Sequence, residues 1–339
     1  MKRLLAMLLS ASILLCGCSG GKGGDQGEDT KPQTLGTALP ETIPVIIDVD
    51  TGTDDALALL AANKSDGLEI RGITVVQGCV DLQQAGENTR KLSSTYGIDA
   101  TIALGAETPL KRDPIRDIEH HGEDGLGGYQ MTGQGKLSEL SAVDFIKQEA
   151  ERCDGKLQII ALGPLTNIAQ AVETYPELEK KIARIIAACG NTDPSKAEFN
   201  AKNDPEALQI VLQSGIPVDL VTWQVTNLNP EEVPDDKAPL MPVNAFRVAA
   251  QREPASSLDP LYRAFSESKV GNQEFSMMAV SYANFPGYLD LPELVSVTCN
   301  TTDNPGALTI EEAEQSQIKC LSASSVDGLQ ILGLIKECY

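Results

Sequence analysis

Positive charge is scarce in this sequence. Its 339 residues include 27 lysines and arginines against 48 aspartates and glutamates, so the net charge is −21. Loss of an amino-terminal segment that contains Lys2 and Arg3 would remove two positive charges and leave −23. A surface this acidic repels phosphate backbones and anionic lipid head groups. The composition therefore argues against nucleic acid as a partner.

Cysteine pairs of the metal-binding type are also absent from the sequence. Six cysteines follow residue 18, and none of them forms a CxxC pair or has zinc-type spacing. A zinc site is therefore not expected. An exported protein can form disulfides, but the sequence does not choose between the alternative pairings and six free thiols. These cysteines are Cys79, Cys153, Cys189, Cys299, Cys320 and Cys338.

The apolar run from Leu4 to Leu15 is too short to span a bilayer as a permanent helix. It follows a basic start and ends in Leu15-Cys16-Gly17-Cys18, which resembles a bacterial lipobox. We therefore interpret residues 1–17 as a lipoprotein signal peptide and Cys18 as the acylated first residue of the mature protein. The protein would be exported and held at the bacterial cell envelope by a lipid anchor only. An ordinary signal peptide that is cleaved elsewhere is the alternative.

Residues 18–42 are rich in small and polar residues and lack an apolar period, which is typical of a flexible tether. Residues 43–339 are long enough to form one large domain with a full core. The sequence contains no internal repeat and no second linker. It is compatible with a homo-oligomer, but it does not fix the oligomeric state.

Short aliphatic runs alternate with segments of helical period from residue 44 onward. Strands that are apolar throughout and separated by helices predict an α/β fold, a single domain with a mostly parallel, Rossmann-like central sheet flanked by helices. The expected strands are Val45–Val49, Ile70–Val76, Leu157–Leu162, Ile182–Ala187 and Val218–Thr222, and the expected helices are Asp54–Asn63, Leu82–Tyr96 and Leu165–Glu173.

The last third of the chain gives a weaker pattern. Residues from Pro230 to Tyr288 are expected to be mainly helical. Val295–Thr298 and Gln317–Leu321 are expected as edge strands, and Ser325–Glu337 as a closing helix.

An acidic cluster follows the first expected strand. The run from Asp48 to Asp55 places four carboxylates within eight residues, and they would repel one another strongly unless a cation lay among them. Ligands collect at the carboxyl ends of strands in an open parallel sheet, and carboxylate oxygens suit calcium or magnesium. The alternative is helix capping by Asp54 with a solvated Asp48. A dehalogenase-type phosphatase motif fails at Gly52, and an EF-hand loop fails at Gly52 and Leu59.

The pattern strand-DxDxGxDD-helix resembles the opening signature of the inosine-uridine preferring nucleoside hydrolase family, whose members cleave the N-glycosidic bond of ribonucleosides. Four later segments resemble other family motifs and occur in the expected order. They are Ile73–Gly78 at the second strand end, His121–Gly127 in the active-site loop, Gly163–Ala169 in the central turn and Glu198–Ala207 in the sugar-binding segment.

The resemblance implies a calcium site and a general base. Asp50 and Asp55 would bind calcium, with the backbone carbonyl of Leu162 as a third protein ligand. Asp50 would also be the catalytic residue, acting as general base toward a water on the metal.

The resemblance also implies a site for the nucleoside or ribose. Asp54 would bind the ribose hydroxyls, and Glu198 and Asn200 the remaining sugar oxygens. His121 would lie on a mobile loop near the ligand. An oxocarbenium-like sugar would be stabilised by this group of carboxylates.

Departures from the family pattern, among them Ala188-Cys189-Gly190 where the family usually has Met-Gly-Gly, leave the activity open. The family's late His-Asp pair, which provides a calcium carboxylate and an imidazole, aligns with Ser281 and Tyr282, and Cys79 replaces an asparagine. The chain would therefore hydrolyse nucleosides with extra waters, or with Glu274 or Asp290 completing the metal site. The alternative is a catalytically degenerate surface lipoprotein that binds a nucleoside or pentose. A purely structural role would not explain why all four opening aspartates are retained.

Overall fold

The computed structural model describes residues 42–225, 275–284 and 293–321. It confirms the predicted alternation of strands and helices, with most boundaries within two residues of those expected. The strands are β1 (Ile43–Val49), β2 (Leu68–Val75), β4 (Leu157–Ala161), β5 (Ile182–Ala188) and β6 (Val218–Val221). The helices of the same units are α1 (Thr53–Lys64), α2 (Leu82–Tyr96) and α5 (Thr166–Thr174).

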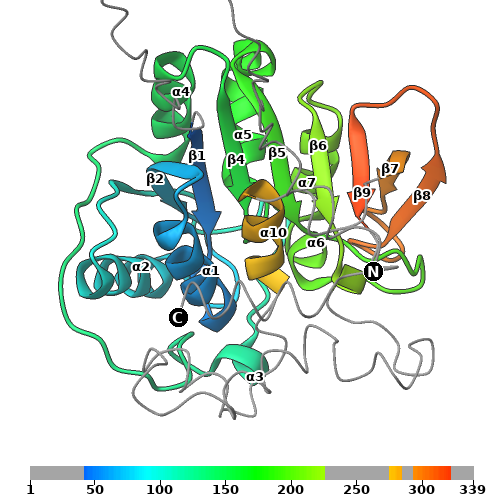
Figure 1. The fold of residues 1–339 in the computed structure, drawn as a ribbon. Coiled ribbons are helices and arrows are strands. Elements are labelled where there is room, and N and C mark those ends of the chain that lie inside the picture. The colour runs from blue at the N-terminus through cyan, green and yellow to red at the C-terminus, as the bar shows by residue number, and fades with distance from the viewer. Residues whose placement is uncertain (1–41, 226–274, 285–292, 322–339) are drawn as a thin grey trace, which may run out of the picture. The chain divides into compact units, whose positions relative to one another are not determined.

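The described strands form one nine-stranded sheet in the order β3-β2-β1-β4-β5-β6-β9-β7-β8. The strands from β3 to β9 in this order pair in parallel, whereas β7 is antiparallel to both β9 and β8. The added strands are β3 (Ile102–Leu104), β7 (Glu293–Cys299), β8 (Leu308–Glu312) and β9 (Ile318–Leu321). The prediction of an α/β fold with a mostly parallel sheet is therefore confirmed (Figure 1).

β7 and β9 confirm the strands expected at Val295–Thr298 and Gln317–Leu321, but the expectation that they lie at the edges of the sheet was wrong. β9 pairs with β6 on one side and β7 on the other, and β7 also pairs with β8. The edges of the described sheet are instead β3 and β8, both of which were missed. Both are short, and β8 has only one buried residue, so neither shows the long apolar run that marks an interior strand.

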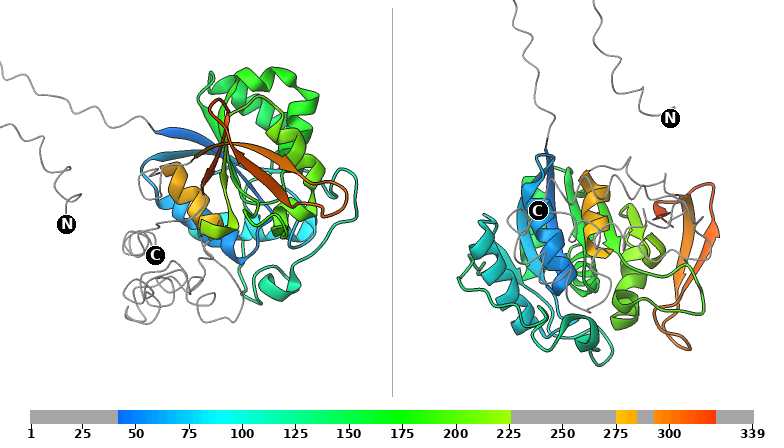
Figure 2. Two further views of the ribbon diagram at one scale, coloured as in Figure 1. Left: turned by 90° about the vertical axis from the view of Figure 1, so that its right-hand side faces the viewer. Right: turned by 60° about the horizontal axis from the view of Figure 1, so that its bottom comes forward.

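Helices cover both faces of the sheet and bury a separate core against each face. One core joins alternate strand residues to α1, α2 and α10 (Phe275–Asn284), and includes Leu57, Leu92 and Met277. The other joins the opposite strand residues to α4 (Ala142–Arg152), α5 and α7 (Pro205–Leu212). Figure 2 shows the two groups of helices on opposite sides of the sheet.

Local hydrogen bonds explain where several helices begin and end. The Asp81 side chain accepts from the Gln84 amide at the start of α2, and the Ser141 hydroxyl accepts from the Asp144 amide at the start of α4. Gly97 ends α2 with φ = 66°, a left-handed conformation that glycine adopts without steric cost. The short elements are α3 (Ile118–His121), η1 (Pro176–Lys180), α6 (Phe199–Asn203) and η2 (Trp223–Val225).

Several predictions lie outside the described residues. These include Cys18, the boundaries of residues 1–17 and 18–42, and the closing helix Ser325–Glu337. Of the expected helical region from Pro230 to Tyr288, the structure describes Phe275–Asn284, which is helical. Within the described ranges, no helix is both long and apolar enough to cross a membrane.

Candidate active site

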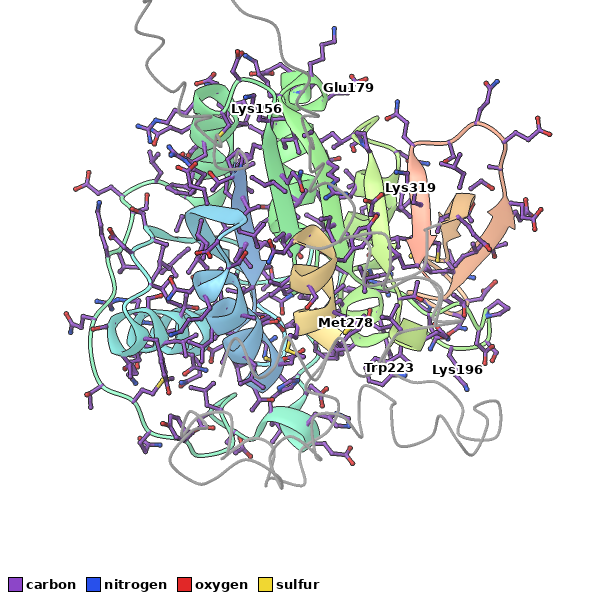
Figure 3. All side chains as sticks on the ribbon, in the orientation of Figure 1. Lys156, Glu179, Lys196, Trp223, Met278 and Lys319 are labelled. Atoms are coloured by element: carbon purple, nitrogen blue, oxygen red, sulfur yellow. The ribbon has the colours of Figure 1, made fainter. Side chains whose placement is uncertain are left out.

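A cavity of about 420 Å³ opens at the carboxyl ends of the central parallel strands. Asp50 and Asp54 line it from the turn after β1, and Leu162 from the turn after β4. The acidic face continues with Glu198, and the lining also includes Cys79, Asp117, His120, His121, Asn191, Lys196, Phe199, Asn200, Trp223 and Phe275. Figure 3 labels Trp223 and Lys196, which lie at the lower end of the molecule, toward which β1 points in Figure 1.

Asp50 lies against closely packed backbone. Its Oδ2 accepts from the Cys79 amide at 2.6 Å. A Cβ atom at Gly78 would lie 2.0 Å from this oxygen, and one at Gly163 would lie 2.9 Å from Oδ1, so both glycines are needed for the close approach. Burial first, and then the nearby Asp54 charge, raise the pKa of Asp50. The carboxyl group is thus held rigidly at the cavity wall.

Asp55 lies behind Asp50 rather than on the cavity surface. Its Oδ2 accepts from the Asp50 amide at 3.0 Å, whereas its buried Oδ1 has no hydrogen-bond partner. Burial, followed by the charges of Asp54 and Asp50, raises the pKa of Asp55 well above its usual range. An unpartnered oxygen among repelling carboxylates is what a cation would satisfy.

The backbone carbonyl of Leu162 completes the oxygen donors expected at this point. It accepts from Asn200 Nδ2 at 2.6 Å, and a carbonyl oxygen has a second lone pair to offer. Across the described ranges, no three His, Cys, Asp or Glu side chains together form a group that could hold a metal ion. The protein donors seen here are therefore two carboxylates and one carbonyl, a small set for a calcium site.

Asp48 belongs to a different environment from the three later aspartates. It is fully buried, and its Oδ1 accepts from Thr74 Oγ1 and from Asn167 Nδ2. Asn167 in turn accepts from the Ala106 amide, so these polar groups join β1 to neighbouring segments. Asp48 is therefore neither a cavity residue nor solvated, and the acidic cluster at the cavity consists of Asp50, Asp54 and Asp55.

Glu198 and Asn200 both line the cavity, and backbone contacts fix them. The Glu198 carboxylate accepts from the amides of Gly190, Asn200 and Ala201, and burial raises the pKa of Glu198 to about 7. Asn200 Nδ2 donates to the carbonyls of Leu162 and Ala188. The Asn200 Oδ1 is thereby oriented as an acceptor.

Aromatic side chains form the wall that sequence reasoning missed. Phe199, Trp223 and Phe275 line the cavity, and the rings of Trp223 and Phe275 meet edge to face with centroids 5.5 Å apart. Trp223 comes two residues after β6, so the rule that ligands bind at strand ends could have found it. Phe275 starts a helix far along the chain, and no local signal marks it.

The family model of the inosine-uridine preferring nucleoside hydrolases matches residues 45–328 of this chain. The chain belongs to this family. It is 38% identical over 192 residues to the pyrimidine-specific ribonucleoside hydrolase RihA of Salmonella typhimurium, covering 55% of this chain and 61% of the relative. It is 36% identical over 200 residues to uridine nucleosidase 1 of Arabidopsis thaliana, covering 56% and 59%.

Solved nucleoside hydrolase structures agree with this family assignment. A plant nucleoside hydrolase superposes with a TM-score of 0.72 at 26% identity, covering 88% of this chain and 99% of that one. An inosine-guanosine nucleoside hydrolase superposes with a TM-score of 0.73 at 26% identity, covering 87% and 98%. The sequence matches to the two curated relatives span 59% and 61% of those proteins.

The expected position of the family's late His-Asp pair was wrong. Tyr282 donates to Asp219 Oδ2 at 3.0 Å, and Ser281 donates to the Met277 carbonyl, so neither reaches the cavity. A helix rises 1.5 Å per residue, which places Ser281 about 7.5 Å along α10 from Ser276. Glu274 and Asp290, the other candidates for the missing carboxylate, lie outside the described residues.

The first turn of α10 is the part that reaches the acidic cluster. Ser276 is fully buried and donates to Asp54 Oδ2 at 2.8 Å, while Phe275 lines the cavity. A hydroxyl and a phenyl ring therefore stand beside the aspartates, where the family comparison led us to expect a carboxylate and an imidazole. The sequence alignment missed this because α10 has no charged residue to fix its register.

Both histidines of the chain lie at the cavity, in the turn formed by α3. His120 is half exposed, and its ring bonds Asp117, whereas His121 turns inward to Thr53. The six cavity residues expected from sequence, Asp50, Asp54, His121, Leu162, Glu198 and Asn200, are thus brought together, with Asp55 directly behind Asp50. Their individual roles stay predictions.

Proposed function

We propose that this protein hydrolyses the N-glycosidic bond of ribonucleosides to ribose and free base with the help of calcium. The observation that carries the proposal is the cavity itself, which is lined by rigidly held carboxylates and by aromatic rings. A nucleoside can use both kinds of group, because its ribose is rich in hydroxyl groups and its base is flat and apolar on both faces. Family membership adds to this argument.

The polar side of the cavity suits ribose. Asp54 presents its carboxylate to the cavity while Ser276 fixes one of its oxygens, so the group is oriented to accept from hydroxyl groups. Asn200 offers Oδ1 as an acceptor because its amide hydrogens are already donated. Glu198 adds a second carboxylate to the cavity lining, held by three backbone amides. These groups would position the sugar and stabilise positive charge that develops on it.

Asp50 is the proposed general base. Its Oδ2 is held by the Cys79 amide, and its other oxygen stays available to take a proton from a water. The rings of Phe199, Trp223 and Phe275 would contact the base and keep bulk water away from the bond that breaks.

The calcium part of the proposal rests on oxygen atoms of Asp50, Asp55 and Leu162. Asp55 Oδ1 is buried without a partner, and Asp50 and the Leu162 carbonyl provide further hard oxygen atoms. The positive charge of calcium held there would offset the repulsion among the aspartates and lower the pKa of a nearby water. The ion would also orient the ribose diol. We expect weak affinity, because Ser276 adds a hydroxyl rather than a third carboxylate.

The residues at the first turn of α10 support a second candidate function. With Ser276 and Phe275 at the start of α10, the described part of the site offers no imidazole there to protonate a leaving base. A surface lipoprotein that binds a nucleoside or pentose without cleaving it would need only the positioning groups. His120 and His121 are the imidazoles that the chain retains.

A release assay separates the two candidates. The purified protein is incubated with inosine, uridine or adenosine plus calcium, and free ribose is measured against an Asp50→Asn variant. Saturable release from at least one nucleoside, lost in the variant and with a chelator, is the expected result. No release above the variant, together with saturable nucleoside binding by calorimetry, would leave the binding protein as the function.

Lipid anchoring at Cys18 is part of the same proposal. The lipobox-like sequence supports it. Labelled palmitate should enter the chain in bacterial cells, and a Cys18→Ala variant should lose both the label and membrane association. Equal labelling of wild type and variant would refute the anchor.

A further inference from the structure

The first helix after β1 lacks a side-chain cap of its own. α1 begins at Thr53, and its N-cap residue is Gly52, which has no side chain to bond the exposed amides of the first turn. This helix carries Asp54 and Asp55 in that first turn. The geometry of the acidic cluster therefore depends on what holds the start of α1.

His121 supplies the missing cap from a distant loop. Its Nδ1 lies 3.2 Å from the Thr53 amide nitrogen and 3.0 Å from Thr53 Oγ1. An amide N–H can only donate, so Nδ1 is the acceptor and the proton of the neutral ring lies on Nε2. Nε2 faces Asp117 Oδ2 at 4.0 Å. Both ring nitrogens thus face protein groups.

The absence of a side chain at Gly52 makes this contact possible. A Cβ atom there would lie 2.6 Å from His121 Nδ1 and 2.9 Å from Cε1, distances too short for any side chain. Asn88 provides a second link, because its Nδ2 donates to the Thr51 carbonyl at 3.1 Å and to the Asp124 carbonyl at 2.8 Å. Residues 117–124 are therefore fastened to the turn that bears Asp54 and Asp55 on both sides of Gly52.

We propose that His121 is a positioning residue that caps α1 through Nδ1 and thereby couples placement of the 117–124 loop to placement of Asp54 and Asp55. The inference rests on the proposed function only for its effect on turnover. It departs from the expectation that His121 binds the ligand directly. When this loop contacts the turn, Asp54 and Asp55 are held in position for calcium and ribose. Without that contact, the Thr53 amide at the start of α1 loses its acceptor, His121 Nδ1.

Isosteric substitutions test which ring nitrogen matters. Asparagine at position 121 can place Oδ1 where Nδ1 stands, whereas glutamine places its oxygen where Nε2 stands. In the full chain, amide exchange of Thr53 followed by NMR should be close to wild type in His121→Asn and about tenfold faster in His121→Gln and His121→Ala, as expected for loss of a cap. His120→Asn is the matched control and should leave this amide unchanged.

Turnover should follow the same order. The kcat/KM for ribose release is expected to stay within about threefold of wild type in His121→Asn and to fall about tenfold in the other two variants. If His121→Gln kept the wild-type kcat/KM and His121→Asn lost it, the proposal would be overturned and the role would be assigned to Nε2. Unchanged Thr53 exchange in all three variants would also overturn it. If the wild type releases no ribose, the exchange data still decide the cap, so the two proposals fail separately.

Discussion

Replacing Asp55 with asparagine should stabilise the protein without calcium and should remove most of the stabilisation that calcium gives to the wild type. Asp55 is 1% exposed, and its Oδ1 has no partner. Its folded-state pKa is raised by burial and by its acidic neighbours, so its charge opposes folding above the unfolded-state pKa. An amide keeps an oxygen for the Asp50 N–H and offers N–H groups to the neighbouring carboxylates.

The expected gain in chelator is about 1–3 kcal/mol, the usual penalty of a buried polar group that lacks a partner. That raises the melting temperature by roughly 2–4 °C for each kcal/mol in a domain of 150–250 residues. Calcium at 100 times its Kd should stabilise the wild type by about 2.7 kcal/mol, and the variant by much less. The assay is thermal unfolding in chelator and across a calcium series.

The exposed Asp66 follows the same helix, so Asp66→Asn is the matched control for loss of one negative charge. It should change neither the stability in chelator nor the response to calcium by more than about 0.5 kcal/mol. A lower melting temperature of Asp55→Asn in chelator, or a calcium response equal to that of the wild type, would refute the reasoning about Asp55.

Three further predictions follow from the contacts of the site. Ser276→Asp should raise calcium affinity at least about tenfold in calorimetry, because it adds a carboxylate beside Asp54, whereas Ser276→Asn should not. In chelator the unfolding free energy should fall as pH rises from 4.5 to 7, because burial raises the pKa of both Glu198 and Asp48 to about 7 and the folded state holds protons that the unfolded state releases. The share of Glu198 is up to about 3 kcal/mol, and Glu198→Gln should make the slope shallower by that amount. Tyr282→Phe should cost about 1 kcal/mol through the lost bond to Asp219 and leave calcium and nucleoside binding unchanged.

The parallel half of the fold could be predicted from the sequence because its strands carry a continuous signal. β1, β4 and β5 are buried on both faces, so each reads as an aliphatic run that ends at a glycine or polar turn. The edges gave no such signal. β3 has three residues, and β8 is mostly polar, because one side of an edge strand meets solvent.

The residues of the candidate site also differ in how clearly the sequence marks them. Asp50, Asp54 and Glu198 belong to local motifs directly after strands or before helices, so the sequence marks them. Ser276 and Phe275 reach the site only because α10 packs beside α1, a contact between residues more than 200 positions apart in the chain. Sequence alignment alone placed the wrong residues of α10 there, and the correction depended on seeing which turn of the helix touches Asp54.

The cap on α1 was hidden for a related reason. His121 was expected near the ligand from its motif, but Nδ1 meets a backbone amide 68 residues earlier in the chain. The glycine at position 52 looked like a turn residue. In the folded protein it also makes room for the imidazole.

The most direct test of the proposed function is ribose release in phosphate-free buffer, measured for the wild type and Asp50→Asn at saturating calcium. The cavity geometry predicts calcium-dependent release by the wild type from at least one of inosine, uridine and adenosine, and a loss of at least about a hundredfold in the variant, as for removal of a general base. Equal rates in the two proteins, or no release by the wild type, would contradict hydrolysis at this site.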